Sequence, residues 1–110
     1  MSDTREQAIV LDLWTVSEDD RDEFMAAMVG LFERLRELDG FIEGQILTGA
    51  NPSLFATYAR VRTAAERDAA LIDPQVQALM RRLRQIAKPK PHAYTVAQSF
   101  TQAGRTKPAA

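Results

Sequence analysis

The residues best suited to chemistry in this sequence are one histidine and two tyrosines. His92 is the single histidine of the chain, and an imidazole can act as a general base near neutral pH. Tyr58 and Tyr94 can each donate a phenolic proton to the carbonyl of a ligand. The competing interpretations are a solvated strand end for His92, which has no acidic neighbour in sequence, and buried rings with satisfied hydroxyls for both tyrosines.

Large apolar side chains supply a candidate binding surface. Trp14 can stack on a flat aromatic ligand because its indole is large and rigid, although the same ring can fill the core or a dimer interior. Met28 and Met80 are adaptable side chains that can line a pocket for a hydrophobic molecule, and at helical spacing they also serve as core residues. These positions therefore indicate an apolar interior more firmly than they indicate a specific ligand.

Arg60 offers a cation on the same strand parity as Tyr58. It can bind an acidic group of a ligand, or it can pair with Asp12 or Glu43 across a sheet. We favour the ion pair, because such cross-strand charge pairs are common structural features.

The composition excludes several functional classes. Cysteine is absent, which removes disulfide frameworks, thiolate zinc sites and thiol nucleophiles and fits a reducing compartment. With 14 basic and 15 acidic residues the net charge is −1, so there is no electrostatic footprint for nucleic acid. Phosphate-loop, nucleophile-elbow and metal-ligand motifs are lacking, and no cofactor and no metal is implied. No apolar run approaches the roughly 18 residues that span a bilayer, so we expect a soluble, cytoplasmic protein without a membrane partner.

The first half of the chain predicts a strand followed by a long helix. Residues 8–16, "AIVLDLWTV", are rich in β-branched and aromatic residues and predict a buried strand. Ser17 and Asp20 have capping-box spacing and predict the start of a helix, which Gly40 ends because glycine readily adopts the left-handed conformation. The apolar residues of this helix recur with the 3.6-residue period at Phe24, Met28, Leu31, Phe32, Leu35 and Leu38.

A hairpin follows the first helix. Residues 41–49 and 54–61 predict two antiparallel strands joined by the turn "GANPS", with a bulge or a close backbone approach at Gly44.

Two start signals and a final strand complete the pattern. Thr63 and Glu66 repeat the capping-box spacing, and Asp73 with Pro74 restarts the helix. The proline-rich segment that follows ends it, and residues 92–100, "HAYTVAQSF", predict the fourth strand.

This order of elements predicts an α+β, ferredoxin-like βαββαβ domain with a four-stranded antiparallel sheet and both helices on one face. We assign the domain to residues 8–100, with flexible ends at 1–7 and 101–110. Apolar residues on both parities of the strands indicate that the other face of the sheet is also covered. A second copy would cover it, so we expect a homodimer built as a dimeric α+β barrel.

The chain resembles the antibiotic biosynthesis monooxygenase (ABM) domain family, whose members are dimeric α+β barrels of this length and element order. The resemblance covers about residues 8–100. The family includes catalysts, haem-degrading proteins and many members with no assigned activity. The resemblance is carried by "DGFIEGQIL", "FATYARVRTAAERDAAL", "DPQVQALMRRL" and "HAYTVAQSF".

One branch of the family that this chain resembles looks like the cofactor-independent oxygenases that convert an anthrone to a quinone. Members of that branch carry an Asn and, four residues on, a Trp on the third strand. Matching "FATYARVR" to this pattern places Thr57 at the Asn position and Val61 at the Trp position. Thr57 can still exchange hydrogen bonds but lacks the amide geometry, and Val61 supplies only an apolar wall. The helix-borne proximal His of the haem-degrading branch has no match, because His92 starts a strand.

The resemblance implies a cofactor-independent monooxygenase that oxidises an aromatic or polyketide-like small molecule in an apolar pocket between sheet and helices. The alternatives are a non-catalytic dimeric module that binds a hydrophobic small molecule, and a polyketide cyclase of the same fold. The candidate catalytic residues are Thr57, His92, Tyr58 and Tyr94, and the candidate substrate-binding residues are Trp14, Met28, Phe32, Phe55, Val61 and Met80.

Overall fold

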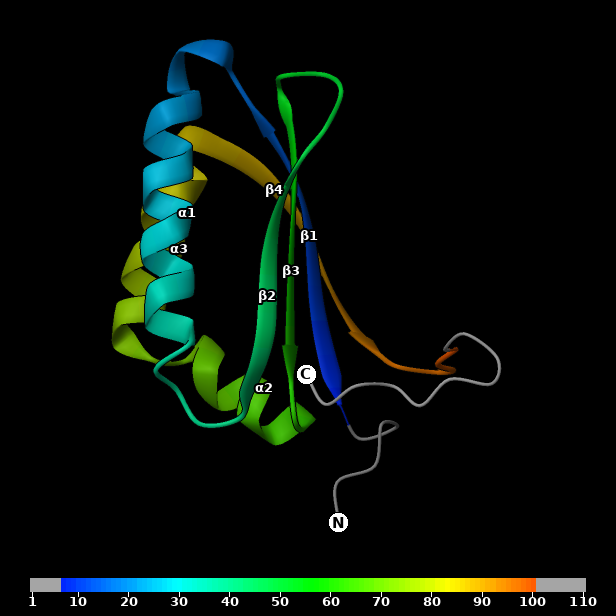
Figure 1. Cartoon of the computed structure of the whole chain (residues 1–110). Helices are drawn as coiled ribbons and strands as arrows, with labels where there is room; N and C mark the ends of the chain where they lie inside the picture. The colour runs from blue at the N-terminus through cyan, green and yellow to red at the C-terminus, as the bar shows by residue number, and fades with distance from the viewer. Residues whose placement is uncertain (1–6, 101–110) are drawn as a thin grey trace.

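The computed structural model describes residues 7–100, apart from the side chains of residues 90–93. The predicted flexible tail at 101–110, and the predicted flexible N-terminus except Gln7, lie outside the described residues. Within this described part of the chain, four strands, three α-helices and one short 3-10 turn follow one another (Figure 1). They are β1 (Ala8–Val16), the 3-10 turn Glu18–Asp20, α1 (Arg21–Leu35), β2 (Phe41–Thr48), β3 (Leu54–Val61), α2 (Ala64–Leu71), α3 (Pro74–Ile86) and β4 (Ala87–Thr95).

The strands form one four-stranded sheet in the order β2-β3-β1-β4. Every neighbouring pair in it is antiparallel. Helices α1 and α3 lie side by side on one face of this sheet, and α2 lies near one end of it (Figure 1). The predicted ferredoxin-like α+β arrangement is therefore confirmed.

Two local signals behave as predicted, and a third does so only in part. The Thr63 hydroxyl accepts a 3.1 Å hydrogen bond from the Glu66 amide at the start of α2, and the Asp73 carboxylate accepts one of 3.1 Å from the Val76 amide at the start of α3. Gly40 does adopt the left-handed conformation, with a φ of 91°, but the prediction that it ends the helix is wrong, because α1 ends at Leu35 and its C-cap is Arg36.

The beginning of α1 differs from the prediction. The Ser17 hydroxyl donates a 2.8 Å hydrogen bond to the Asp20 carboxylate and caps no backbone amide. The chain forms a 3-10 turn there, so α1 begins at Arg21 and ends at Leu35.

The predicted bounds of the last strand, 92–100, are wrong, because β4 spans Ala87–Thr95 and directly follows α3. Pro89 and Pro91 lie within it, opposite Trp14 and Asp12 of β1. A proline is tolerated in an edge strand when the missing N–H faces away from the sheet. Residues two apart place their amide positions on the same side of a strand, so both prolines are compatible with one free edge.

The core lies between the helices and the sheet and is built around three aromatic rings. Phe24 of α1 packs edge-on against Trp14 of β1, with ring centroids 5.4 Å apart. The centroid of the Phe24 ring also lies 4.8 Å from that of Phe55 on β3. Such contacts stabilise beyond the area they bury. The remaining buried members of this cluster are Val16, Met28, Leu31, Val76, Leu83 and Ala87.

Candidate functional site

Two polar side chains are buried beside each other on the helix-facing side of the sheet. Asp12 of β1 lies directly opposite Thr57 of β3 in the antiparallel register, and directly opposed residues share one face of a sheet. Asp12 is 8% exposed and Thr57 is 4% exposed. Because apolar residues surround these two polar side chains, the pair is a candidate functional site.

The Thr57 hydroxyl is oriented by the core. The indole N–H of Trp14 donates a 2.9 Å hydrogen bond to Thr57 Oγ1. A threonine hydroxyl has one proton to donate and can accept twice, so this bond leaves the Thr57 proton for another acceptor. Donation into the oxygen also polarises the O–H bond, because linked hydrogen bonds strengthen one another.

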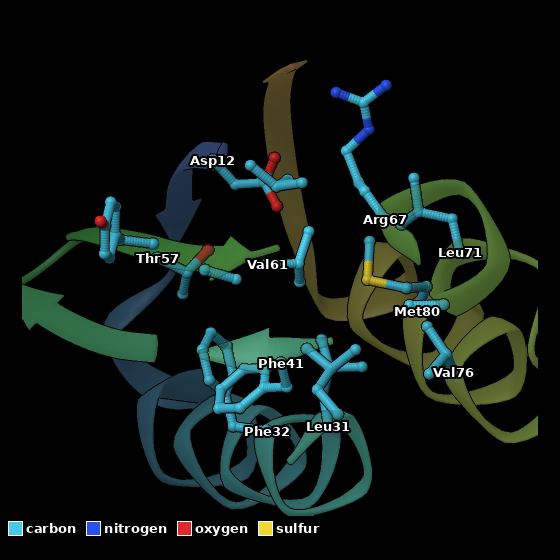
Figure 2. A pocket seen from close by; sticks show the side chains of 15 residues that line it. Asp12, Leu31, Phe32, Phe41, Thr57, Val61, Arg67, Leu71, Val76 and Met80 are labelled. Atoms are coloured by element: carbon cyan, nitrogen blue, oxygen red, sulfur yellow. The ribbon is translucent and has the colours of Figure 1, made fainter. Parts of the chain in front are cut away.

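A cavity of about 70 Å³ opens beside this pair, between the sheet and the helices (Figure 2). Its walls are mainly apolar, and Asp12 and Arg67 are the charged members among the described residues that line it. Figure 2 shows Asp12 and Arg67 on one side of the cavity and Leu31 and Phe32 on the other. The described residues that line it are Val10, Asp12, Leu31, Phe32, Leu35, Phe41, Thr57, Tyr58, Ala59, Val61, Arg67, Ala70, Leu71, Val76 and Met80.

Arg67 reaches the cavity from α2. Its side chain is 18% exposed, and its guanidinium lies 3.2 Å from the carboxylate of Asp68, which is 70% exposed. An ion pair with so exposed a partner is weak. Arg67 thus brings a cation to the same side of the cavity as the Asp12 carboxylate.

Phe32 meets the sheet through a close approach at Gly44. A Cβ atom on Gly44 would lie 2.3 Å from Cε2 of Phe32, a separation that no real side chain tolerates. The sequence predicted a bulge or a close approach at Gly44. The close approach is found there, whereas the irregularity in the β2–β3 register lies earlier, between Phe41 and Glu43. The absence of a side chain at Gly44 lets Phe32 form one wall of the cavity.

The candidate binding residues divide into two groups. Thr57 lines the cavity, as do Phe32, Val61 and Met80. The structure places Trp14, Met28 and Phe55 in the core cluster instead, so any effect of these three on a ligand passes through the residues they support.

The candidate acids and bases are not brought together. Tyr58 is among the cavity residues, but its hydroxyl donates a 3.3 Å hydrogen bond to Glu43. Tyr94 is 46% exposed and lies opposite Ile9 in the register. His92 lies opposite Leu11, and its side chain falls outside the described part of the chain.

Tyr58, Glu43 and Arg60 form a polar cluster on the uncovered side of the sheet. The Arg60 guanidinium lies 2.9 Å from the Glu43 carboxylate, so the predicted cross-strand ion pair is confirmed. Burial raises the pKa of the Tyr58 phenol, and the nearby Glu43 carboxylate adds to this rise while Arg60 opposes it. A phenol with a raised pKa keeps its proton at neutral pH.

Asp12 is the residue that sequence reasoning missed. It was considered only as a partner for Arg60, which lies on the opposite face of the sheet. The available signal was its parity, because Ala8, Trp14 and Val16 share that parity with Asp12 and are buried. Burying a carboxylate at an otherwise apolar, core-facing parity is costly unless the group is paired or hydrogen-bonded, so its presence there was a signal worth following.

The described residues offer neither a metal-binding cluster nor a membrane-spanning helix. No group of three His, Asp or Glu side chains there is placed to hold a metal ion. No helix there is long and apolar enough to cross a bilayer.

Comparisons with known proteins identify the fold. No family model matches the sequence, and no curated protein matches it. Among solved structures, the chain is similar to SnoaB, a cofactor-independent oxygenase from Streptomyces nogalater, with a TM-score of 0.82 and 15% identity over 88% of this chain and 99% of that chain. A candidate antibiotic biosynthesis monooxygenase from Deinococcus radiodurans gives a TM-score of 0.79 and 16% identity over the same 88% and 99%.

A conserved protein from Methanosarcina mazei Go1 has a TM-score of 0.79 and 15% identity over 84% of this chain and 94% of that chain. The resemblance to ABM-type proteins is therefore confirmed in three dimensions across most of the chain. At these identities the likeness establishes the fold and leaves substrate and reaction to be argued from the site.

Proposed function

We propose that the protein is a cofactor-independent monooxygenase that oxidises an electron-rich aromatic or polyketide-like small molecule. The observation that carries this proposal is the cavity, whose apolar walls enclose the adjacent oxygen-bearing side chains of Asp12 and Thr57. The similarity in fold to SnoaB, described as a cofactor-independent oxygenase, supports the same reaction class.

The reaction in this proposal uses the substrate as its own reductant. A methylene group flanked by aromatic rings and activated by a carbonyl loses a proton and becomes a carbanion. The carbanion passes its electrons to dioxygen, and one oxygen atom remains as a new carbonyl while the other leaves as water, so that R₂CH₂ + O₂ gives R₂C=O + H₂O. The protein contributes a dry cavity and a fixed orientation.

Thr57 has a defined part in this scheme. When the substrate loses its proton, negative charge spreads onto the existing carbonyl oxygen. The Thr57 hydroxyl, held by the Trp14 N–H at 2.9 Å, is positioned to donate to that oxygen. Such a preoriented donor stabilises developing charge more than a mobile water does.

The size of the cavity requires movement. Its volume is about 70 Å³, whereas an engineered cavity of about 150 Å³ admits benzene. Helix α2 is eight residues long and buries only Ala70 among its residues, and Ile72 beyond it is 70% exposed. Outward movement of α2, which carries Arg67 and Leu71, would enlarge the cavity because both residues line it.

The uncovered face of the sheet supports a homodimer. Leu13 is 57% exposed, and Leu47 and Leu54 are each 46% exposed. These three side chains line a hollow of about 310 Å³ on that face. Contiguous exposed apolar surface of this kind usually marks an interface, and a second copy of the sheet offers a matching surface.

Oxygen uptake tests the proposed reaction. Purified protein, treated with a chelator, is added in air to a panel of anthrones and hydroquinones without any cofactor, and dissolved oxygen and product are measured together. The proposal predicts protein-dependent oxygen uptake matched by quinone formation. A panel left unchanged would count against it.

The alternatives give different outcomes in the same experiment. The presence of Thr57 and Val61 where the anthrone oxygenases carry Asn and Trp favours a non-catalytic binding module as the second candidate. Such a module would be stabilised thermally by a panel compound without turnover. A cyclase would consume a polyketide-like substrate without consuming oxygen.

A further inference from the structure

Asp12 occupies the position in the cavity where a base is needed. Its Cα lies opposite that of Thr57 in the register of β1 and β3, and both residues line the cavity. A substrate whose carbonyl oxygen accepts from the Thr57 hydroxyl would therefore place neighbouring C–H groups toward the same part of the cavity. A carboxylate held there needs no large movement to meet such a proton.

The surroundings of Asp12 leave few other groups for this task. The cavity residues contributed by α1 are Leu31, Phe32 and Leu35, and those contributed by α3 are Val76 and Met80, none of which titrates. Among the described residues of the lining, Arg67 of α2 is the other charged one, and a guanidinium does not act as a base near neutral pH. On β4, the residue opposite Asp12 is Pro91, which has no ionisable side chain.

We propose that Asp12 is the catalytic base that removes the proton from a neutral substrate with a carbonyl-activated C–H group. The carboxylate oxygen accepts the proton, the C–H bond breaks, and its electron pair moves into the enolate whose oxygen accepts a hydrogen bond from Thr57. This role rests on the proposed function, because the enolate is the species that dioxygen then oxidises. Arg67, on the same side of the cavity in Figure 2, offsets the negative charge of the site.

The same arrangement selects against acidic substrates. A ligand carrying a carboxylate would bring a second negative charge beside Asp12 in a poorly solvated cavity, where like charges repel strongly. A neutral ketone or phenol avoids this repulsion. The substrate class is therefore neutral and enolisable.

Hydrogen exchange under nitrogen tests the role of Asp12 without any oxidation. The probe is 2-indanone, a small neutral ketone whose methylene protons exchange with D₂O when a base removes them, as followed by proton NMR. We expect the wild-type protein to accelerate exchange over buffer by about 10²-fold or more, the usual effect of a positioned base. Asp12→Asn should exchange at the buffer rate, and Asp12→Glu should retain part of the activity. Gly30 does not line the cavity and its new Cβ would meet Leu79 at an ordinary 3.8 Å, so Gly30→Ala should match wild type.

The outcomes separate this proposal from the oxygenase proposal. Exchange in Asp12→Asn at the wild-type rate, or no acceleration by wild type, overturns the role of Asp12 whatever the oxygen uptake shows. Loss of exchange in His92→Gln with full exchange in Asp12→Asn also overturns it. Asp12-dependent exchange without oxygen uptake in air supports Asp12 as the base and removes the oxygenase. Circular dichroism tests whether each variant is folded. If Asp12→Asn is unfolded, the exchange rate of Asp12→Glu is used in its place: a rate below that of wild type supports the role of Asp12, and the wild-type rate overturns it.

Discussion

The indole N–H of Trp14 donates a 2.9 Å hydrogen bond to the hydroxyl of Thr57, and this contact joins the aromatic core to the cavity. Trp14 is 1% exposed and packs against Phe24, so its position is fixed by the core. Thr57 in turn faces the cavity beside Asp12. The core thereby determines the direction in which a cavity hydroxyl can donate.

Replacing Thr57 tests that link. Thr57→Val keeps the shape of the side chain but leaves the buried Trp14 N–H without its acceptor, which should lower the free energy of unfolding by about 1–3 kcal/mol. Urea unfolding measures the change. Thr57→Ser keeps the hydroxyl and is the matched control, and equal stability of the Val variant and wild type would show that the hydrogen bond contributes nothing.

Gly44 tests the wall formed by Phe32. In Gly44→Ala the new Cβ would lie 2.3 Å from Phe32 Cε2, so the ring must shift at a cost of about 1–3 kcal/mol. We expect a lower urea midpoint.

Gly30→Ala is the matched control for that substitution. Its Cβ would lie 3.8 Å from the Leu79 side chain, which is an ordinary contact. Alanine in the middle of α1 should stabilise the protein by about 0.5–1 kcal/mol. A Gly44→Ala variant as stable as Gly30→Ala would contradict the described packing.

The boundary signals of the sequence predicted most of the fold because they act locally. The Thr63 and Asp73 caps each satisfy an amide within three residues, so nearby sequence is enough to identify them. The last strand was placed too late because Pro89 and Pro91 were interpreted as breakers. Their tolerance depends on β4 being an edge strand, which is a property of the whole sheet.

The site was harder to predict than the fold. Thr57 and Val61 were found through the third strand, and both line the cavity. Asp12 was missed because its importance depends on which parity of β1 faces the helices. That parity follows from the pairing of Asp12 with Thr57, and residues 45 positions apart in sequence give no local sign of it.

The ion pair between α1 and the start of α3 predicts a pH effect. Arg34 binds Asp73 through two hydrogen bonds of 2.8 and 3.1 Å. This bonding is the main reason why the pKa of Asp73 lies below the ordinary value of 3.8. A carboxyl with a lowered folded pKa stabilises the protein above its unfolded pKa and loses this effect as the pH falls through the folded pKa. Asp73→Asn keeps a good helix cap but lacks the charge.

Urea midpoints at several pH values measure that effect. We expect wild type to exceed Asp73→Asn at pH 7, and the gap to shrink as the pH falls below the 3.8 of an ordinary Asp. The control is Glu33→Gln, which removes an exposed pair with Arg36 and should behave as wild type throughout. A gap that does not change with pH would mean that the charge of Asp73 is not its cause.

The exposed leucines predict the assembly state. In sedimentation experiments at micromolar concentration, wild type should be a dimer, and Leu13→Asp should be a monomer because a charge would be buried in the interface. Val29→Gln changes a residue of similar exposure, 46% against 57%, but on helix α1, and should remain dimeric. A monomeric wild type would contradict the proposed interface.

Oxygen uptake in a variant with a filled cavity tests the central claim most directly. Ala59 lies on β3 between Thr57 and Val61 and lines the cavity of about 70 Å³, so Ala59→Leu should occupy the space that a substrate needs. With an anthrone or hydroquinone that wild type oxidises, we expect the oxygen uptake of folded Ala59→Leu to fall to the rate without protein, while Gly30→Ala keeps the wild-type rate. Wild-type oxygen uptake by Ala59→Leu would contradict the claim that the reaction takes place in this cavity.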